Sequence, residues 1–251
     1  MPNVDLNCDM GESFGFWTMG NDAELMNYVS SVNIACGFHA GDAATMRKTV
    51  ETAVEKGVAI GAHPGYPDLQ GFGRRAMSLS LEEVFDIVLY QVSALKGICE
   101  VSGDRLHHVK PHGALYNQAA KDQRLANAIA EAVRKIDGNL IIYGLSGSFL
   151  ISEARHRGLA AASEVFADRT YQSDGSLTPR TQPNALIADS GKAVNQVLQM
   201  VEDQTVNTAD GETIPIKTDT ICIHGDGGNA VEFARKIRAA LDNKGVSVMR
   251  P

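Results

Sequence analysis

Four of the seven histidines follow short apolar segments that we predict to be β-strands, and they are His39, His63, His112 and His224. Asp9 occupies the same kind of position. Neutral imidazole and ionised carboxylate ligate zinc and similar ions, and both also act as general acids and bases near neutral pH. No HExxH pair is present, so a metal site would draw its ligands from different strands, with Asp9, His39 and His63 as candidates. The residue types leave metal binding and metal-free acid–base catalysis equally open.

The first predicted strand, Val4 to Cys8, carries polar residues at alternate positions. Asp5, Asn7 and Asp9 share one strand face if the extended segment continues, and Glu12 follows closely. Several carboxylates in one cavity would raise the pKa of one of them, which produces a general acid or base. A solvated loop start is the alternative interpretation for Glu12.

A glycine-rich turn, Gly225-Asp226-Gly227-Gly228, precedes a predicted helix near the C-terminus. Free backbone N–H groups at a helix N-terminus bind phosphate or carboxylate, although glycines can also serve only to make a tight turn. Lys110 follows Val109 within another predicted strand. A lysine there is costly to bury without a partner, so we expect it to be paired or to reach an anionic group.

Two long loops, residues 65–75 and 168–180, combine glycine, aromatic residues and arginine. Such loops are typical of lids or substrate clamps, and a contact between protein chains is the alternative. Their candidate binding residues for substrate or phosphate are Arg74, Asp168 and Arg169. We predict the same role for Glu164, which ends the strand before the second loop, and for Asn7 and Glu12 near the first strand.

These side chains are positioned by an alternation of short strands and helices. A serine–glutamate capping box, Ser80 to Glu83, predicts that one long helix begins near Leu81. The chain lacks GxGxxG after its first strand and GxxxxGK[ST] throughout, so we favour a closed barrel over an open nucleotide-binding sheet. We predict one domain over residues 1–251, a distorted TIM-like (β/α)7 barrel, with Ser247 to Met249 as a weak terminal strand. The seven predicted strands are Val4–Cys8, Val32–Cys36, Val58–Ala62, His107–Pro111, Leu140–Leu145, Leu159–Ser163 and Thr220–His224.

Composition restricts the class of partner. The 251 residues carry a net charge of −7 without a block of five like charges, which argues against nucleic acid and membrane surfaces and favours a small molecule or a protein. Four scattered cysteines fit a reducing cytoplasm. We see no secretory leader and no apolar run long enough to span a bilayer, so we expect a cytoplasmic protein.

Six segments stand out along the chain, and they are DLNCDMGESFG, NIACGFHAGD, GAHPGYPDLQGFGRR, VKPHGALYN, SEVFADRTY and HGDGGNA. Together they resemble the LamB/YcsF family, whose members are A subunits of an ATP-dependent 5-oxoprolinase. The resemblance implies a barrel related to the glycoside hydrolase/deacetylase type. It also implies opening of the 5-oxoproline lactam to L-glutamate at the expense of ATP, together with subunits B and C.

In the reaction that this resemblance implies, ATP, with Mg²⁺ as its counter-ion, phosphorylates the lactam oxygen and water attacks the activated carbon. The 225–228 turn and Lys110 would hold phosphate, and Asp9 with His39 or His63 would activate water. His112 or His224 would protonate the departing nitrogen. Two rival functions are a stand-alone metal-dependent deacetylase or amidohydrolase, and a non-catalytic subunit that only presents substrate.

Overall fold

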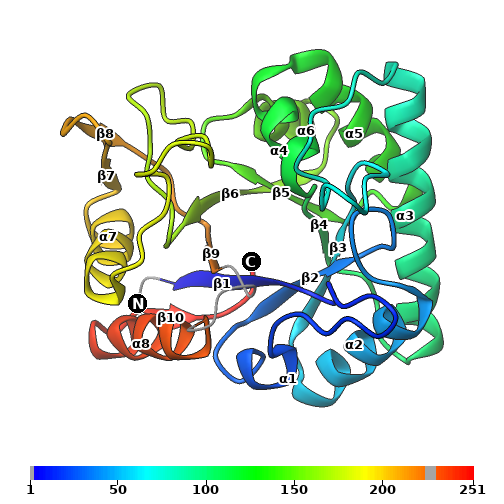
Figure 1. Ribbon diagram of the computed structural model, residues 1–251, viewed down its shortest axis with the longest axis horizontal. Coiled ribbons are helices and arrows are strands. Elements are labelled where there is room, and N and C mark those ends of the chain that lie inside the picture. The colour runs from blue at the N-terminus through cyan, green and yellow to red at the C-terminus, as the bar shows by residue number, and fades with distance from the viewer. Residues whose placement is uncertain (1–2, 224–229) are drawn as a thin grey trace.

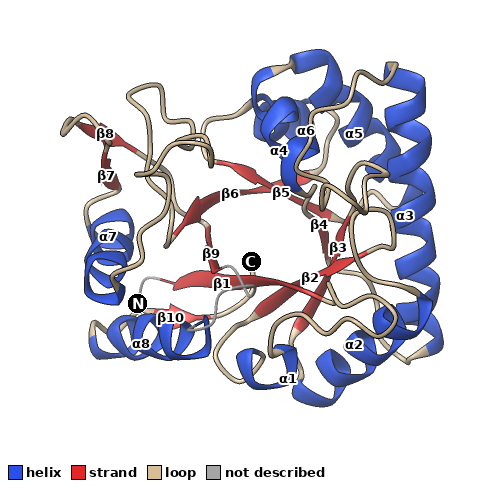
Figure 2. Cartoon of the chain, viewed as in Figure 1, coloured by secondary structure: helices blue, strands red, loops and turns tan. Residues whose placement is uncertain are grey.

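The computed structural model describes residues 3–223 and 230–251, and it confirms the predicted (β/α)7 barrel. Seven parallel strands pair in the order β1-β2-β3-β4-β5-β6-β9, and β9 pairs with β1 to close the ring (Figures 1 and 2). The strands are β1 (Asn3–Met10), β2 (Ser31–Ala35), β3 (Ala59–His63), β4 (His108–Val109), β5 (Ile141–Leu145), β6 (Ala160–Phe166) and β9 (Thr220–Ile223).

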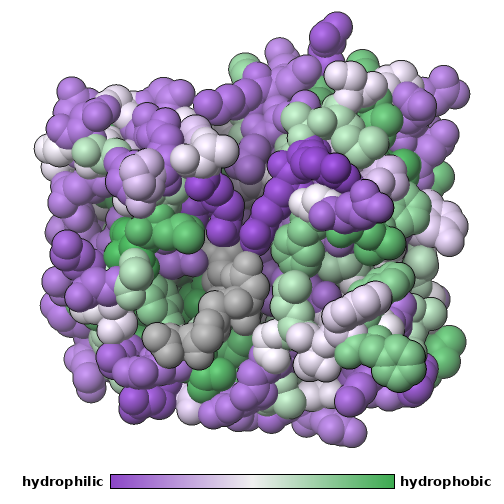
Figure 3. Space-filling model, viewed as in Figure 1, coloured by the Kyte–Doolittle hydropathy of each residue, from purple (hydrophilic) through white to green (hydrophobic). Residues whose placement is uncertain are grey.

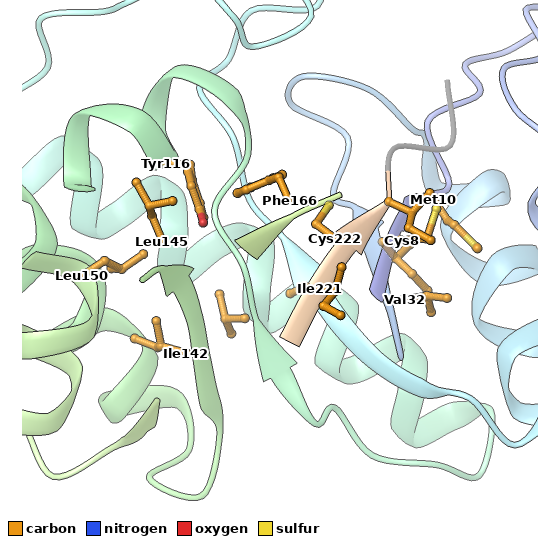
Figure 4. Packing of buried hydrophobic residues seen from close by; sticks show 14 of the residues in the cluster. Cys8, Met10, Val32, Tyr116, Ile142, Leu145, Leu150, Phe166, Ile221 and Cys222 are labelled. Carbon is orange, nitrogen blue, oxygen red and sulfur yellow. The ribbon is translucent and has the colours of Figure 1, made fainter. Parts of the chain in front are cut away.

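Helices lie outside this ring of strands (Figure 1). The predicted capping box is present, because the Ser80 side chain accepts from the Glu83 N–H while the Glu83 carboxylate accepts from the Ser80 N–H. The helices are α1 (Asp22–Leu25), α2 (Ala43–Lys56), α3 (Leu81–Val101), α4 (Gly113–Lys121), α5 (Gln123–Ile136), α6 (Phe149–His156), α7 (Ser190–Glu202) and α8 (Ala230–Asn243). Apolar side chains fill the space between strands and helices, as Ile142 and Leu145 of β5 do beside Leu150 of α6 (Figure 4).

The predicted terminal strand is present: Ser247–Val248 forms β10, which pairs with the first residues of β1. Two other parts of the fold differ from the prediction. A short antiparallel hairpin, β7 (Thr205–Asn207) with β8 (Thr213–Pro215), precedes β9 and was not predicted. Strand β4 contains two residues, since Pro111 has no N–H to donate to a ladder. Among the described residues, no helix has the length and hydrophobicity that crossing a membrane requires.

The inside of the barrel is polar and arranged in layers. Side chains alternate along β1, so Asp5, Asn7 and Asp9 point to one side, as predicted, while Cys8 and Met10 pack with Val32 on the other (Figure 4). In the lowest layer the Asp5 carboxylate accepts hydrogen bonds from the hydroxyls of Ser30, Ser31 and Thr220 at 2.6–2.7 Å.

The middle layer links five strands. The Asn7 amide donates to Glu164 Oε1 at 3.0 Å, and the Asn33 amide donates to Asn7 Oδ1 at 2.7 Å. His108 Nε2 lies 2.8 Å from Asn33 Oδ1, and its ring stacks on Tyr143. These hydrogen bonds form a polar core beneath the residues at the ends of the strands.

Candidate active site

A cavity of about 790 Å³ lies where the barrel strands end, at the face on which TIM-like barrels carry their active sites. Strongly hydrophilic residues gather around the middle of the face shown in Figure 3. The sequence-predicted residues that line the cavity are Asp9, Glu12, His63, Arg74, Lys110, His112 and Arg169. Residues far apart in sequence therefore meet at one site.

Lys110 lies at the floor of the cavity and joins three other strands. Its ammonium contacts Asp9 Oδ1 at 2.8 Å, Glu164 Oε1 at 2.9 Å and the Cys222 sulfur at 3.0 Å. Tyr116 donates to the second oxygen of Glu164 at 2.7 Å. The lysine is paired inside the barrel, and it would have to leave these partners to hold a phosphate.

The charge of Lys110 is stabilised where it lies. Burial alone would lower the pKa of the lysine, but the carboxylates of Asp9 and Glu164 outweigh burial and raise that pKa well above its ordinary value. Cys222 remains a neutral thiol, because burial raises its pKa well above the usual range. The floor of the cavity therefore carries two carboxylates and one ammonium.

Two histidines face each other beside Asp9. His63 Nδ1 lies 2.7 Å from the Lys110 carbonyl oxygen, and His112 Nε2 lies 2.9 Å from the Phe72 carbonyl oxygen. A carbonyl oxygen only accepts hydrogen bonds, so each of these ring nitrogens carries the hydrogen. The opposite nitrogens, His63 Nε2 and His112 Nδ1, are 2.9 Å apart.

His39 lies flat against His112, with ring centroids 3.7 Å apart and an angle of 2° between the planes. Glu12 Oε1 is 3.5 Å from His39 Nε2 and 3.8 Å from His112 Nδ1. Burial, followed by the neighbouring histidines, lowers the pKa of both His39 and His112 well below the ordinary value. Both rings are therefore neutral at physiological pH.

The loop after β3 packs its backbone against these rings. A Cβ at Gly65 would lie 2.6 Å from His39 Nδ1, and a Cβ at Gly73 would lie 2.7 Å from the His39 Cβ. Gly73 also has a φ of +61°, which favours glycine. Loop 65–75 thus acts as a wall that holds the imidazoles in place.

Glu12, His39, His63 and His112 could hold a metal ion, since one donor atom from each lies within 4.8 Å of the others. The predicted ligand set of Asp9, His39 and His63 overlaps this group in two residues. Asp9 stands beside it, with Oδ2 3.4 Å from His63 Nε2 and Oδ1 bonded to Lys110 and Asn33.

The other predicted binding residues have different surroundings. Asn7 and Glu164 have no exposed surface and lie beneath the cavity, where they support Lys110. Arg169 donates to the carbonyls of Thr178 and Ala185 and so ties down the 168–180 loop. Arg74 is exposed and lies over the Phe72 ring, and Asp168 is half-buried outside the cavity lining. His224, Gly225, Asp226, Gly227 and Gly228 lie outside the described residues.

Sequence reasoning missed several residues that support the site, namely Asn33, Phe72, Tyr116, His108 and Cys222. Asn33 had a usable signal, because it is an amide at the centre of the otherwise apolar segment VNIA. The rest resemble ordinary core or loop residues. Their roles arise only from contacts across the ring.

Comparison with known proteins places the chain among close relatives. A model of the LamB/YcsF family matches residues 4–251. A protein from Tolumonas auensis, named as the A subunit of 5-oxoprolinase, is 61% identical over 248 residues, which is 99% of each chain. The crystal structure of a lactam utilization protein from Thermus thermophilus has a TM-score of 0.94 at 46% identity and covers 99% of this chain and 100% of that one.

More distant structures share the fold alone. A family 4 carbohydrate esterase from Streptomyces lividans has a TM-score of 0.51 at 13% identity, covering 98% of this chain and 91% of that chain. The barrel thus has the same general fold as this carbohydrate esterase.

Proposed function

The chain belongs to the LamB/YcsF family, and from this membership we propose that it is the A subunit of an ATP-dependent 5-oxoprolinase. It would be a hydrolase that opens a cyclic amide, 5-oxo-L-proline, to L-glutamate, together with subunits B and C. The observation that carries the proposal is the 61% identity, over 99% of both chains, to a protein named as the A subunit of that enzyme.

The lactam must be activated before water can open it. A five-membered lactam is a stable amide, and phosphorylation of its oxygen by ATP, with Mg²⁺ as counter-ion, converts that oxygen into a leaving group. We assign this activation to the complex as a whole, because this sequence contains no P-loop or GxGxxG motif of its own.

Asp9 is the residue of this chain that fits the hydrolytic half of the reaction. One of its oxygens is bound by Lys110, and the carboxylate lines the cavity. It would take a proton from the attacking water and return it to the ring nitrogen, which leaves as the amine and opens the ring to an acyl phosphate. A second water would then displace phosphate from that carbon and give the side-chain carboxylate of glutamate. Lys110 would keep the carboxylate ionised between turnovers.

The cavity wall also suits the carboxylate of the substrate. Arg74, Arg169 and Arg180 all line the cavity. 5-Oxoproline is an anion near neutral pH, and guanidinium groups bind carboxylates with strong, oriented hydrogen bonds. Such contacts would orient the lactam ring toward Asp9.

We expect the reaction to take place in the cytoplasm. Cys8, Cys36, Cys99 and Cys222 are all buried without disulfide partners. Unpaired cysteines are typical of a reducing compartment, where ATP is also supplied.

The test is reconstitution of the purified chain with subunits B and C, following glutamate formation from 5-oxoproline with and without ATP. We expect turnover only in the complete mixture, and we expect Asp9→Asn to reduce it at least about a hundredfold. His156→Ala, a change at an exposed helix position, is the matched control and should leave turnover unchanged. Normal turnover by a folded Asp9→Asn variant would mean that this cavity does not perform the hydrolysis, as expected of a purely binding subunit.

A stand-alone metal-dependent amidohydrolase is the second candidate, and the buried Glu12 and three-histidine group favours it. Glutamate formation by this chain alone, without ATP or partners, would support that function. The same assay therefore separates the two candidates.

A further inference from the structure

The contact between His63 and His112 cannot be a simple hydrogen bond between neutral rings. Each ring uses its only hydrogen to donate to a backbone carbonyl, of Lys110 and Phe72 respectively. The two nitrogens that face each other at 2.9 Å therefore both present lone pairs. Two lone pairs at that distance repel unless a positive centre lies between them.

His39 also lacks partners for its ring nitrogens, which is an observation independent of the His63–His112 contact. Its side chain is 1% exposed, and among residues 3–223 and 230–251 neither ring nitrogen has a hydrogen-bond partner. A buried polar group without a partner costs free energy, so such a group in a folded protein calls for an explanation. A proton shared by His63 and His112 would satisfy that pair alone and would leave His39 as it is.

One positive centre can satisfy the facing nitrogens of His63 and His112 together with Nε2 of His39. His39 Nε2 faces Glu12 Oε1 at 3.5 Å, and the same oxygen lies 3.8 Å from His112 Nδ1. We infer that Glu12, His39, His63 and His112 form a binding site for one divalent transition-metal ion, for which Zn²⁺ is the best match. Three imidazoles and one carboxylate are donors that zinc accepts.

The spacing of the donor atoms agrees with such a site. Ligand nitrogens at 2.0–2.1 Å from a tetrahedral zinc ion lie about 3.3 Å from each other. The four donor atoms lie within 4.8 Å of one another, and three of their separations are 2.9, 3.5 and 3.8 Å. Shifts of a few tenths of an ångström to about one ångström would bring them around one ion, provided that the His39 ring also tilts out of its stacking on His112. The tilt is required because the lone pair of an imidazole nitrogen lies in the plane of its ring.

The surroundings also orient the ligands. Backbone carbonyls that accept from the far nitrogen of His63 and of His112 hold each ring in the tautomer that presents its lone pair inward. Gly65 and Gly73 keep the loop backbone close to His39. These contacts are the kind of outer support that metal-bound histidines have in other proteins.

This assignment goes beyond the proposed reaction. It gives the histidines the role of metal ligands and leaves proton transfer to Asp9, whose carboxylate is engaged by Lys110 and Asn33. Glu12, His63 and His112 line the cavity, so the ion would lie in its wall next to Asp9.

The experiment measures metal binding directly and does not depend on activity. The full chain, purified without a histidine tag and treated with EDTA, is titrated calorimetrically with ZnCl₂, and Co²⁺ is added separately to follow its visible absorption. We expect one ion per chain and a tetrahedral Co²⁺ spectrum. We expect Glu12→Gln and His39→Ala to weaken Zn²⁺ binding at least about a hundredfold.

His156→Gln is the control for adventitious binding, because this histidine is exposed and far along the chain from the cluster. The Zn²⁺ affinity of the His156→Gln variant should equal that of the unchanged chain. Circular dichroism of each variant establishes that it is folded, and Glu12→Gln, which keeps the side-chain size, serves if His39→Ala does not fold. Absence of stoichiometric Zn²⁺ or Co²⁺ binding to the unchanged chain, or equal affinity in Glu12→Gln, would overturn the inference whatever the glutamate assay shows.

Discussion

At the scale of single residues, Gly61 of β3 shows how closely the barrel interior is packed. A Cβ at this position would overlap the ring of His108, which is buried, bonded to Asn33 and stacked on Tyr143. The ring has no room to move. We expect Gly61→Ala to lower the free energy of unfolding by about 2–3 kcal/mol, measured by urea denaturation.

Gly97 provides the matched control. It lies on the exposed side of α3, and a Cβ there would meet nothing within 4 Å. Gly97→Ala should raise the free energy of unfolding by about 0.5–1 kcal/mol, because alanine favours a helix more than glycine does. Similar effects of both substitutions would contradict the packing argument.

The buried carboxyl of Asp5 should make the free energy of unfolding depend on pH. Burial raises the pKa of this carboxyl above its ordinary 3.8, while the hydroxyls of Ser30, Thr220 and Ser31 oppose the shift. A raised pKa in the folded state means that Asp5 stabilises the fold most below about pH 3.8 and loses that contribution as pH rises through the folded pKa.

The test compares the free energy of unfolding of the unchanged chain with that of Asp5→Asn. The value for the unchanged chain minus the value for the variant should decrease as pH rises from 4 upward. The decrease amounts to about 1.4 kcal/mol for each unit by which folding raises the pKa. Thermal or urea unfolding of both proteins at a series of pH values measures this difference, in which the other titrating groups cancel. A difference that stays constant with pH would show that Asp5 is not perturbed.

Residue patterns predicted which side chains point inward but not which ones meet. The alternation of Asp5, Asn7 and Asp9 was sufficient to place them on one face of β1. Asn33, which donates to Asn7 and Asp9, comes from another strand, and so does His108, which bonds to Asn33. These hydrogen bonds depend on the strand register, which a single sequence does not encode locally. The positions of the histidines at strand ends were informative, whereas the stacking of His39 on His112 depends on the path of loop 65–75.

At the scale of elements, the start of α3 rests on Ser80. Its hydroxyl accepts from the Glu83 N–H, and the Glu83 carboxylate caps the Ser80 N–H in return. Ser80→Ala removes one acceptor from the helix end, and we expect a loss of about 1 kcal/mol in urea unfolding. Ser93→Ala, on the exposed side of the same helix, should have no destabilising effect. Equal losses in both variants would argue against the cap.

Elements were predictable in proportion to their length and regularity. The long amphipathic helices and the apolar strands could be recognised from the sequence, because many residues contribute to each pattern. The β7–β8 hairpin has three residues in each strand and is half exposed, so no alternating pattern can emerge from it. Strand β4 could not be delimited either, since its end depends on the hydrogen bonds that Pro111 cannot make.

At the scale of the whole molecule, the alternation of strands and helices and the lack of nucleotide-binding motifs predicted a barrel, and the structure shows how its sides are joined. Lys110 follows β4 and reaches Asp9 of β1, Glu164 of β6 and Cys222 of β9. One ammonium thus connects strands from opposite parts of the sequence. The charges compensate one another only while the ring is closed, so this network should contribute to the cooperativity of folding.

Lys110→Met tests this connection. The substitution keeps most of the length of the side chain but leaves two carboxylates buried without their cation. Removing one partner of a buried ion pair typically costs about 3–5 kcal/mol. We expect a loss of that size in urea unfolding, followed in parallel by near- and far-ultraviolet circular dichroism. Adding Glu164→Gln removes one of the two stranded charges and should restore part of the loss. A decrease below about 1 kcal/mol in Lys110→Met, or no recovery in the double variant, would mean that the barrel closes through its backbone ladder and apolar packing, independently of this ion network.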